Sequence, residues 1–388
     1  MNDRKTYVVL GAGWQGTAAA YDFGKYGHAA RILIADIDED RAVQAALRLN
    51  ALLQDDIVVP VRADVTKAHE IEQLLRGVDV CLSAVPYYFN VDLTRAAIRA
   101  GCHFCDLGGN TDVVFQQHEL SGMAKQHGVT IAPDCGLAPG MANILAVYGM
   151  RRLKHPHRVR IYVGGLPQEP QPPLDYALTF SIEGLTNEYF GKAYVLRGGE
   201  ITQIDAFSEL EPIEFPPPLG RCEAFITVGG TSTCPWTFAG VLDEYIEKTV
   251  RYPGHYEKMK TIYDLGLLDE KPVQVDGVKV SPRKVFHAVA GPRLLSEDPR
   301  DVVALRVVVS GDEGEVTIEL IDFYDDELEF TAMQRTTGFG AAIIGIMLAQ
   351  GEFPPGSIKL EEAVDPEKYV EALGRRGFDL KIDARIRS

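Results

Sequence analysis

Short apolar runs alternate with longer amphipathic segments over the first 135 residues of the chain. The apolar runs predict β-strands, and the segments between them, in which apolar residues recur every three or four positions, predict helices. This alternation is typical of an α/β fold with a doubly wound parallel sheet and right-handed crossovers. The predicted strands are 7–10, 31–36, 57–63, 78–84, 103–107 and 130–133, and the predicted helices are 14–26, 41–53, 68–75, 92–100 and 118–127.

The pattern changes after Pro139. A helix is predicted over 143–153 and a strand over 159–164, before a proline-rich stretch that is too rigid for a simple turn. From 174 to 330 strand-like pieces dominate, and the last two, separated by Gly311–Gly314, predict a hairpin. Helical periodicity interrupts these pieces at 236–249 and 256–265. The second half therefore predicts an α+β domain with a mainly antiparallel sheet.

A glycine-rich turn, GAGWQG, follows the first predicted strand and opens the first predicted helix. In a dinucleotide-binding turn the first glycine permits the tight turn, the second lets pyrophosphate approach the backbone, and the third lets the helix sit close to the sheet. The helix N-terminus adds N–H groups and the positive end of the helix dipole. The sequence therefore predicts a Rossmann domain whose cofactor contacts include Gly11, Ala12, Gly13, Trp14, Gln15 and Gly16.

Asp36 lies 20 residues after Gly16, at the end of the second predicted strand. A carboxylate there binds the ribose hydroxyls and repels a 2′-phosphate, which favours NAD over NADP, although Arg41 is close in sequence. The ends of the later strands should line the rest of the cofactor crevice, and Asp64 should meet the adenine. The lining positions are Ser83, Ala84, Val85 and Pro86 after the fourth strand, and Leu107, Gly108 and Gly109 after the fifth.

The chain length of 388 residues predicts two domains. We expect residues 1–135 and 331–388 to form the NAD-binding Rossmann domain with a C-terminal return, and 136–330 to form a domain for substrate binding and dimerisation. Residues 335–351 predict one strongly apolar helix with small residues suited to close packing. That helix and the antiparallel sheet suggest a homodimer paired through a two-fold interface of the second domain.

Composition narrows the functional classes. With 39 Lys plus Arg against 55 Asp plus Glu the formal charge is −16, which excludes nucleic acid as a natural partner and is compatible with a cationic small molecule. No apolar run reaches the length of about 18 residues that a membrane helix needs, so no membrane association is expected. A short polar lead into the first strand predicts no signal peptide, which favours the cytoplasm. Of six cysteines, Cys102 and Cys105 form a C-x-x-C without a second pair, so no metal is expected.

Several strings resemble the saccharopine dehydrogenase-like family, and within it the lysine 6-dehydrogenases. They are DLGG (106–109), PDCGLAPGM (133–141), YVGGLP (162–167) with PPLDY (172–176), FSIEGL (180–185), GGTST (229–233) and RTTGFG (335–340). The resemblance covers residues 7 to about 375. It implies NAD-dependent oxidation of L-lysine at Cε, giving an aldehyde that cyclises to a piperideine carboxylate. The saccharopine-handling members share the PDCGLAPG-type turn, whereas in the lysine 6-dehydrogenases the residue at the position of Cys135 is aliphatic, so this cysteine is a departure from them.

Amine oxidation by hydride transfer requires the neutral amine, and lysine holds its proton to a pKa of about 10.4. The site therefore needs a base or a water path, together with groups for the α-carboxylate and α-ammonium. Four residues are candidates for the chemistry itself: Asp134, Cys135, Glu183 and His287. Asp134, at the carboxyl end of the sixth strand, is the preferred base or cation partner, although it could equally cap the following turn. Glu183 could hold an ammonium or be a solvated strand end, and a packing role outweighs catalysis for His287.

Six further residues are candidates for substrate binding: Tyr87, Tyr88, Thr231, Ser232, Arg335 and Thr336. The two tyrosines should pack around the nicotinamide, and the start of the apolar helix could clamp a carboxylate. One alternative function is a saccharopine-type secondary amine oxidoreductase, whose extra substrate carboxylates would need further arginines such as Arg151, Arg152 or Arg197. Another is a non-catalytic NAD-binding protein.

Overall fold

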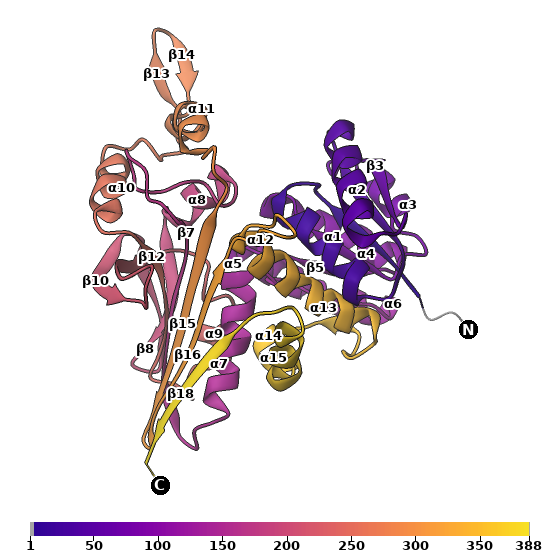
Figure 1. Ribbon diagram of the computed structural model, residues 1–388. Coiled ribbons are helices and arrows are strands. Elements are labelled where there is room, and N and C mark those ends of the chain that lie inside the picture. Colours follow the sequence, from indigo (N-terminus) through magenta and orange to yellow (C-terminus); the bar gives the residue numbers. More distant parts are fainter. Residues whose placement is uncertain (1–3, 388) are drawn as a thin grey trace. The chain divides into compact units, whose positions relative to one another are not determined.

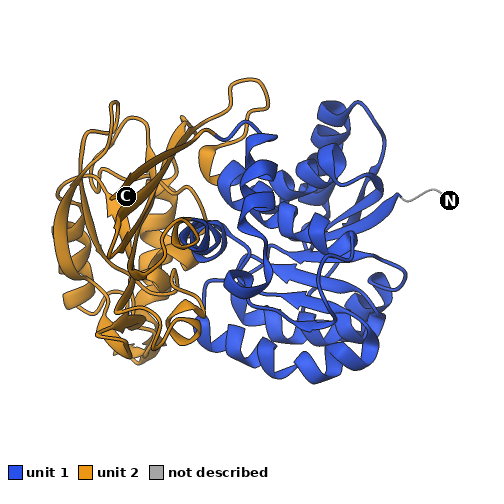
Figure 2. Cartoon of the chain, turned by 90° about the horizontal axis from the view of Figure 1, so that it is seen from below, with its two compact units in different colours: residues 1–148, 334–378 blue, residues 149–333, 379–388 orange. Residues whose placement is uncertain are grey.

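A computed structural model describes residues 4–387, which divide into two compact units (Figures 1 and 2). Unit 1 comprises the chain up to Tyr148 together with residues 334–378, and unit 2 comprises residues 149–333 and the segment from Asp379 onward. The predicted division is close to this one but differs at the C-terminus, which we had assigned entirely to the first domain. The segment after Asp379 belongs to unit 2 because strand β18 (Leu380–Ile386) pairs along β16 (Gly314–Phe323).

Unit 1 is built on a parallel seven-stranded sheet in the order β17-β6-β5-β4-β1-β2-β3, with helices on both faces (Figure 2). This confirms the predicted doubly wound α/β fold. The strands are β1 (Lys5–Leu10), β2 (Ala29–Asp36), β3 (Val58–Arg62), β4 (Val80–Ser83), β5 (His103–Asp106), β6 (Thr130–Ala132) and β17 (Gly356–Ser357). The helices of its N-terminal part are α1 (Trp14–Tyr26), α2 (Glu39–Leu53), α3 (Ala68–Leu74), η1 (Tyr87–Phe89), α4 (Asn90–Ala100), α5 (Thr111–Glu119), α6 (Ser121–His127), η2 (Leu137–Met141) and α7 (Ala142–Met150).

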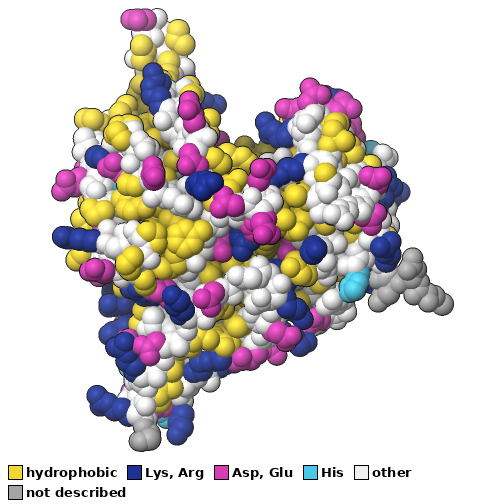
Figure 3. Space-filling model, in the orientation of Figure 1, with side chains coloured by type: hydrophobic (Ala, Val, Ile, Leu, Met, Phe, Trp, Pro, Cys, Tyr) yellow, Lys and Arg dark blue, Asp and Glu magenta, His cyan; other side chains and the backbone are white. Residues whose placement is uncertain are grey.

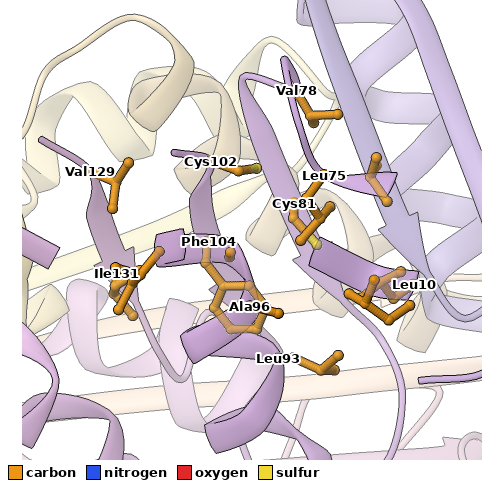
Figure 4. Close-up of a cluster of buried hydrophobic side chains, with 14 of the residues drawn as sticks. Leu10, Leu75, Val78, Cys81, Leu93, Ala96, Cys102, Phe104, Val129 and Ile131 are labelled. Carbon is orange, nitrogen blue, oxygen red and sulfur yellow. The ribbon is translucent and has the colours of Figure 1, made fainter. Parts of the chain in front are cut away.

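Local capping and burial explain these elements. Asp38 accepts a hydrogen bond from the Arg41 N–H at the start of α2, and Asn110 does the same for Val113 at the start of α5. Strand β4 is buried along its whole length, as expected for a central parallel strand. Its Cys81 side chain belongs to a buried cluster that also includes Leu10, Leu75, Val78, Leu93, Ala96, Cys102, Phe104, Val129 and Ile131 (Figure 4).

The C-terminal part of unit 1 begins at Gln334, the last residue of α12 (Ala332–Gln334). It continues without a break through η3 (Arg335–Phe339) and α13 (Gly340–Ala349), where one apolar helix was predicted. Gly345 of α13 lies against the Phe23 ring, and a Cβ there would come 2.7 Å from ring atoms. The small residues therefore allow close helix packing, as the sequence suggested. The unit is completed by α14 (Leu360–Ala363) and α15 (Pro366–Gly374).

Unit 2 contains a nine-stranded sheet whose main path runs β10-β11-β12-β7-β15-β16-β18, with β8 and β9 joined at β12. All its pairings are antiparallel except that of β12 with β7, which confirms the mainly antiparallel sheet. The strands are β7 (Pro156–Pro167), β8 (Lys192–Arg197), β9 (Glu200–Asp205), β10 (Ser208–Glu214), β11 (Arg221–Ile226), β12 (Glu244–Arg251) and β15 (Asp301–Gly311), besides β16 and β18. The turn at Gly311–Gly314 joins β15 to β16 as the predicted hairpin.

Four helices and a small hairpin complete unit 2. They are α8 (Ile182–Glu188), α9 (Cys234–Thr237), α10 (His255–Asp264), α11 (Pro282–Leu294) and the two-stranded sheet of β13 (Val273–Val275) with β14 (Val278–Val280). The hairpin stands at the top of Figure 1 beyond α11, and hydrophobic side chains lie on its surface in Figure 3. Across the described helices of both units, none combines the length and apolar character that a bilayer crossing requires.

Two predicted elements are wrong. The segment 236–249 is not a helix, because only α9 is helical there and residues 244–251 form the central strand β12. Its side chains are buried on both faces of the sheet, so apolar and polar residues recur without the clean alternation of a half-exposed strand. FSIEGL was likewise expected to end a strand, but Ser181 caps α8 by accepting from the Gly184 N–H, and the segment turns into a helix.

Candidate functional site

The glycine turn between β1 and α1 adopts the geometry of a dinucleotide-binding loop. Gly11 has φ +102°, and a Cβ there would lie 2.7 Å from the Ala84 carbonyl oxygen. A Cβ on Gly16 would overlap the Gly11 carbonyl, so the third glycine brings the helix onto the turn. Gly13 is the N-cap of α1, and a Cβ there would meet nothing within 4 Å. The turn is therefore tight on the protein side and open at the helix N-terminus, which fits a pyrophosphate.

Asp36 ends β2 beside this turn. Its carboxylate accepts hydrogen bonds from the Ala12 N–H at 2.9 Å and from the Asp38 N–H at 3.0 Å. A carboxylate has about four acceptor positions, so two remain for a pair of ribose hydroxyls. Arg41 lies 3.9 Å from Asp36 Oδ2, but its side chain is 58% exposed, so this contact is weak. The donors and acceptors around the turn fit a nicotinamide dinucleotide.

The other predicted crevice residues differ in what their side chains do. The Ser83 hydroxyl donates to Asn90 Oδ1 at 2.8 Å and is buried, so this side chain holds the start of α4. Val85 and Ala84 pack against the Gly11 turn. Asp64 is half-buried and accepts from both the N–H and the hydroxyl of Thr66, which lowers the pKa of its carboxyl. Asp64 is therefore a turn-capping residue in this structure, and its contact with adenine stays a prediction.

Tyr87 and Tyr88 follow Pro86 in η1. Their rings meet edge to face with centroids 5.7 Å apart, and Tyr88 is 51% exposed. The Tyr87 ring also lies beside Gly109, whose Cβ would be 4.0 Å from it. The structure thus brings together the loops after β4 and β5, as their common position at the carboxyl edge of the sheet predicts.

A buried aspartate, Asp106, ties the loops after β5 and β6 together. Its Oδ1 accepts from the Gly108 N–H at 2.8 Å and from the Asp134 N–H at 3.2 Å, and its Oδ2 accepts from Gln117 Nε2 at 2.6 Å. Burial raises the pKa of Asp106 to about 6. A Cβ on Gly108 would overlap Asp134 Oδ1, so the glycine makes room for that carboxylate. Sequence reasoning did not single out Asp106, although an aspartate at a strand end before two glycines is a recognisable signal.

Asp134 and Cys135 are both buried beside this network. Asp134 has φ +60° and is 3% exposed, so its carboxylate is set against the Gly108 loop and not at an open lip of the sheet. The Cys135 thiol donates to the Ala132 carbonyl at 3.1 Å, and burial raises its pKa well above the ordinary value. A nucleophilic role requires the thiolate form, which the burial of Cys135 disfavours.

Arg335 and Thr336 pack inside unit 1. The Arg335 guanidinium lies over the rings of Phe339 and Phe378, 5.8 and 5.2 Å from their centroids, and Thr336 is fully buried. Next to them, Gln334 Nε2 donates to the Trp14 carbonyl at 3.0 Å, which links this segment to the glycine turn. Arg335 and Thr336 thus have packing roles here, and their contact with a substrate carboxylate stays a prediction.

Glu183 and His287 come together in unit 2. Glu183 is in the first turn of α8, and His287 on α11 pairs its Nε2 with the Thr186 hydroxyl at 2.9 Å. Burial lowers the pKa of His287, with the nearby Glu183 acting in the opposite sense. Elsewhere in unit 2 the Thr231 hydroxyl donates to the Tyr194 carbonyl at 2.8 Å, and Ser232 is buried with φ +50°. These contacts favour structural roles for Thr231 and Ser232.

A second polar group in unit 2 was missed by sequence reasoning because β12 was predicted as a helix. Glu247, Thr249 and Arg251 alternate along β12 and are all buried. The charged residues of the string EYIEKTVR are three, four and seven positions after Glu244, which is helical spacing, so the local pattern itself favoured the wrong element. Among the described residues, no group of three or more His, Cys, Asp or Glu side chains is arranged to hold a metal ion.

Comparisons with known proteins agree with this architecture. Residues 7–132 match the family model for the saccharopine dehydrogenase NADP binding domain, and residues 136–378 match that for the saccharopine dehydrogenase C-terminal domain. Saccharopine dehydrogenase (NADP(+), L-glutamate-forming) of Pyricularia oryzae is 24% identical over 262 residues, which cover 64% of this chain and 57% of that protein. The same enzyme of Saccharomyces cerevisiae is 23% identical over 290 residues, 69% of this chain and 61% of that protein. The matches thus span only about three fifths of these relatives.

One curated relative matches over nearly its whole length. Carboxyaminopropylagmatine dehydrogenase of a Synechocystis strain is 20% identical over 398 residues, covering 96% of each chain. Among solved structures, apo saccharopine dehydrogenase (L-Glu forming) of Saccharomyces cerevisiae has a TM-score of 0.76 at 19% identity over 98% of this chain and 99% of that one. Homospermidine synthase of Legionella pneumophila in complex with NAD has a TM-score of 0.69 at 12% identity over 98% and 91%. At these identities the structures establish the fold.

Proposed function

Because this chain belongs to the saccharopine dehydrogenase family, we propose that it is a nicotinamide-dependent oxidoreductase acting on a carbon–nitrogen bond of an amino compound. The cofactor is NAD, and the substrate is L-lysine, oxidised at its 6-amino group to the aldehyde that cyclises to a piperideine carboxylate. The observation that carries the proposal is the pairing of an open glycine turn with the Asp36 carboxylate at the end of β2.

NAD is favoured over NADP by charge. A 2′-phosphate beside the buried Asp36 carboxylate would place like charges together, and the exposed Arg41 is too weakly held to offset this. The curated saccharopine dehydrogenases carry NADP(+) in their names, whereas the homospermidine synthase structure contains NAD, so both cofactors occur among the proteins this chain resembles. The choice therefore depends on this chain's own residues.

When bound, a nicotinamide cofactor would supply the hydride acceptor for the proposed reaction. The neutral amine loses that hydride from Cε, which leaves an iminium ion, and water then adds to the iminium carbon and releases ammonium and the aldehyde. The chain must bind the amine, remove its proton and admit one water. We assign Asp134 of unit 1 as the base that accepts the proton of the substrate ammonium, because it lies just after β6 within the Asp106 network.

The net charge of −16 and a relative named for an agmatine derivative both support a cationic substrate. The test is a screen at alkaline pH in which NAD or NADP is offered with L-lysine, L-ornithine, saccharopine or a carboxyalkylated amine, with near-ultraviolet absorbance reporting the reduced cofactor. Lysine-dependent reduction of NAD is expected. Reduction with saccharopine alone would replace the substrate while keeping the reaction class, and NAD binding without turnover on any amine would leave a non-catalytic protein.

The second candidate is a saccharopine-type oxidoreductase of a secondary amine, which the names of the curated relatives favour. Its substrate carries more carboxylates and requires further cationic side chains. Arg197, one of the arginines with which the sequence could have met that need, forms a two-pronged ion pair with Glu209 at 2.7 and 2.9 Å. This arginine is therefore committed, so a secondary-amine substrate would depend on other cations such as Arg151 or Arg152.

A further inference from the structure

A row of buried polar side chains links the ends of β4, β5 and β6 in unit 1. Its central member is Gln117 on α5, which is fully buried. Gln117 Nε2 donates one hydrogen bond to Asp106 Oδ2 at 2.6 Å and a second to the Thr94 hydroxyl at 3.0 Å. An amide nitrogen carries two N–H bonds, so this side chain uses both of its donors. Gln117 therefore joins two branches of hydrogen bonds.

The first branch leads to the loop after β4. The Thr94 hydroxyl donates to the Asn90 carbonyl at 2.7 Å, and Asn90 Oδ1 accepts from the Ser83 hydroxyl at 2.8 Å. Ser83 is the last residue of β4, and Asn90 is the first residue of α4. The branch thus fixes both ends of the loop in which Tyr87 and Tyr88 are expected to pack around the nicotinamide.

The second branch leads to the proposed base. Asp106 Oδ1 accepts from the Gly108 N–H at 2.8 Å and from the Asp134 N–H at 3.2 Å, and the Asp106 carbonyl accepts from the Cys135 N–H at 2.8 Å. Asp134 has φ +60°, a left-handed conformation that costs free energy for residues other than glycine. The hydrogen bonds to Asp106 stabilise this conformation, which sets the Asp134 carboxylate against Gly108.

The orientation of the Gln117 amide follows from these contacts. In the opposite orientation its Oε1 would face Asp106 Oδ2, and two acceptors would meet where a hydrogen bond now lies. In the observed orientation Oε1 has no hydrogen-bond partner among the described residues, which costs free energy at a buried site. An apolar side chain would fill the same space without this cost. The amide is therefore better explained by the two hydrogen bonds that it donates than by packing.

We propose that Gln117 is a positioning residue, which acts through Asp106 on the proposed base Asp134 and through Thr94 on the loop beside the nicotinamide. Because one buried amide is bonded to both branches, it fixes where the base lies relative to that loop. Displacing a reacting group by about 1 Å can cost about 100-fold in rate. The assignment rests on the proposed function, because it takes Asp134 to be the base.

The first test needs no turnover. Gln117→Leu removes both donors and fills the site with an apolar side chain. Amide hydrogen exchange of the full chain is then followed by mass spectrometry of the peptides that contain Gly108 or Asp134. Both of these N–H groups bond to Asp106, so we expect them to exchange faster in the variant. The matched control is Gln116→Leu at the neighbouring, exposed position of α5, which should exchange like the wild type. Unchanged exchange in Gln117→Leu would overturn the proposal.

The second test is turnover of L-lysine with NAD, with the enzyme concentration taken from NADH binding so that unfolded chains are not counted. Gln117→Leu should lower kcat by about 10- to 100-fold, because the base is displaced. KM should stay within about twofold of the wild-type value, because no substrate contact is removed. A kcat equal to that of the wild type would overturn the positioning role.

Gln117→Glu keeps the shape of the side chain and provides a second variant should Gln117→Leu fail to fold. Two carboxyl groups within hydrogen-bond distance share one proton, so the introduced group can donate to Asp106 as the amide does. The loop after β6 adds two titratable side chains here, Asp134 and Cys135, whereas α5 meets Asp106 through position 117. As the pH rises, the shared proton is lost and the two carboxylates repel each other.

The pH profile of kcat in Gln117→Glu should therefore differ from that of the wild type. We expect similar values near neutral pH and a deficit of about 10-fold or more in alkaline solution, where the hydrogen bond to Asp106 is lost. A variant that only disturbed packing would lower kcat by the same factor at every pH. Parallel profiles would thus contradict the proposal.

Failure of this proposal and failure of the proposed function are distinguishable. Faster exchange at Gly108 and Asp134 in Gln117→Leu, with no reduction of NAD by any amine in the wild type, would keep the positioning of this loop and remove the reaction. Lysine-dependent reduction of NAD with a wild-type kcat in Gln117→Leu would remove the positioning role and keep the reaction.

Discussion

The Asp36 carboxylate accepts a hydrogen bond from the Ala12 N–H at 2.9 Å, which ties the end of β2 to the middle of the glycine turn. A single side chain thus orders the loop on which pyrophosphate would lie and presents its remaining acceptors to the adjoining ribose. Cofactor binding and cofactor choice therefore depend on the same residue.

Replacing Asp36 with Ala should weaken NAD binding by about 1.5–3 kcal/mol, because charge-assisted hydrogen bonds are lost, and should narrow the preference over NADP. Titration with NADH and NADPH offers the measurement, since Trp14 is exposed at the first residue of α1 and can transfer energy to a bound reduced nicotinamide. Trp236 is the second tryptophan of the chain, so Trp236→Phe leaves Trp14 as the single reporter.

The control for this prediction is Asp38→Ala. Asp38 caps α2 without bonding to the glycine turn, so its loss should leave the NAD affinity unchanged. Equal dissociation constants for NAD and NADP in the wild type would show that Asp36 does not determine which of the two cofactors the chain binds.

Replacing Asp106 with Asn should change how stability depends on pH. Burial raises the pKa of Asp106 to about 6, above its unfolded value of about 3.9. The native state therefore holds this proton more tightly, so Asp106 favours the fold in acid and that contribution is lost as pH rises through about 6. The difference in free energy of unfolding, wild type minus Asp106→Asn, should decrease by on the order of 1–3 kcal/mol as the pH rises from about 4 to 7. Above about pH 7 it should stay constant.

The asparagine can be accommodated at this position. Gln117 Oε1 has no hydrogen-bond partner among the described residues, so a rotated Gln117 amide could accept from the new side-chain N–H₂. Urea unfolding across this range measures the difference, and a pH-independent difference would contradict the role assigned to burial.

The parallel sheet of unit 1 and the glycine turn were predictable because each depends on local signals, namely buried strands and glycines at fixed spacing. The cluster on β12 was not, because a central strand buried on both faces has no simple period, and Glu247 and Glu188 meet only through the fold. Helix α11 was also missed, although Ser281 caps it and Pro282 occupies its first turn, which is a recognisable start signal. Asp106 and Asp134 lie 28 residues apart, and only strand order brings their loops together.

The buried ion pair of Asp22 and Arg376 should be a main determinant of the stability of unit 1. Arg376 donates to both Asp22 oxygens at 2.7 and 2.6 Å, and burial raises the pKa of Asp22 to about 6 in spite of the arginine. Arg376→Met should lower the free energy of unfolding by about 3–5 kcal/mol, because it leaves a buried carboxylate without its partner. Arg375→Met, which removes an exposed pair with Glu371, should cost at most about 1 kcal/mol in the same urea titrations.

We expect the chain to form a homodimer through unit 2. Val273, Val275 and Val278 are each at least half exposed on the β13–β14 hairpin, and Val285 and Val289 are exposed on α11. An isolated two-stranded hairpin is marginal in water, and clustered exposed apolar side chains mark an interaction surface. Light scattering should give twice the chain mass, and Val275→Lys combined with Val278→Lys should shift the mass toward the monomer. A wild-type monomer mass at every concentration would refute the dimer.

The last prediction concerns the proton that the amine must lose. Free lysine is almost entirely ammonium near neutrality, so if deprotonation limits the reaction, the rate should rise through alkaline pH. Asp134→Asn preserves the shape of the side chain beside Gly108 and removes its charge. It should lower the rate by roughly 10²-fold or more. Binding of NADH, followed by energy transfer from Trp14, should be unchanged. Asp112→Asn, at the exposed start of α5, is the matched control and should have no effect. A near-normal rate in Asp134→Asn, with the pH dependence of the wild type, would mean that Glu183, His287 or water accepts the proton instead.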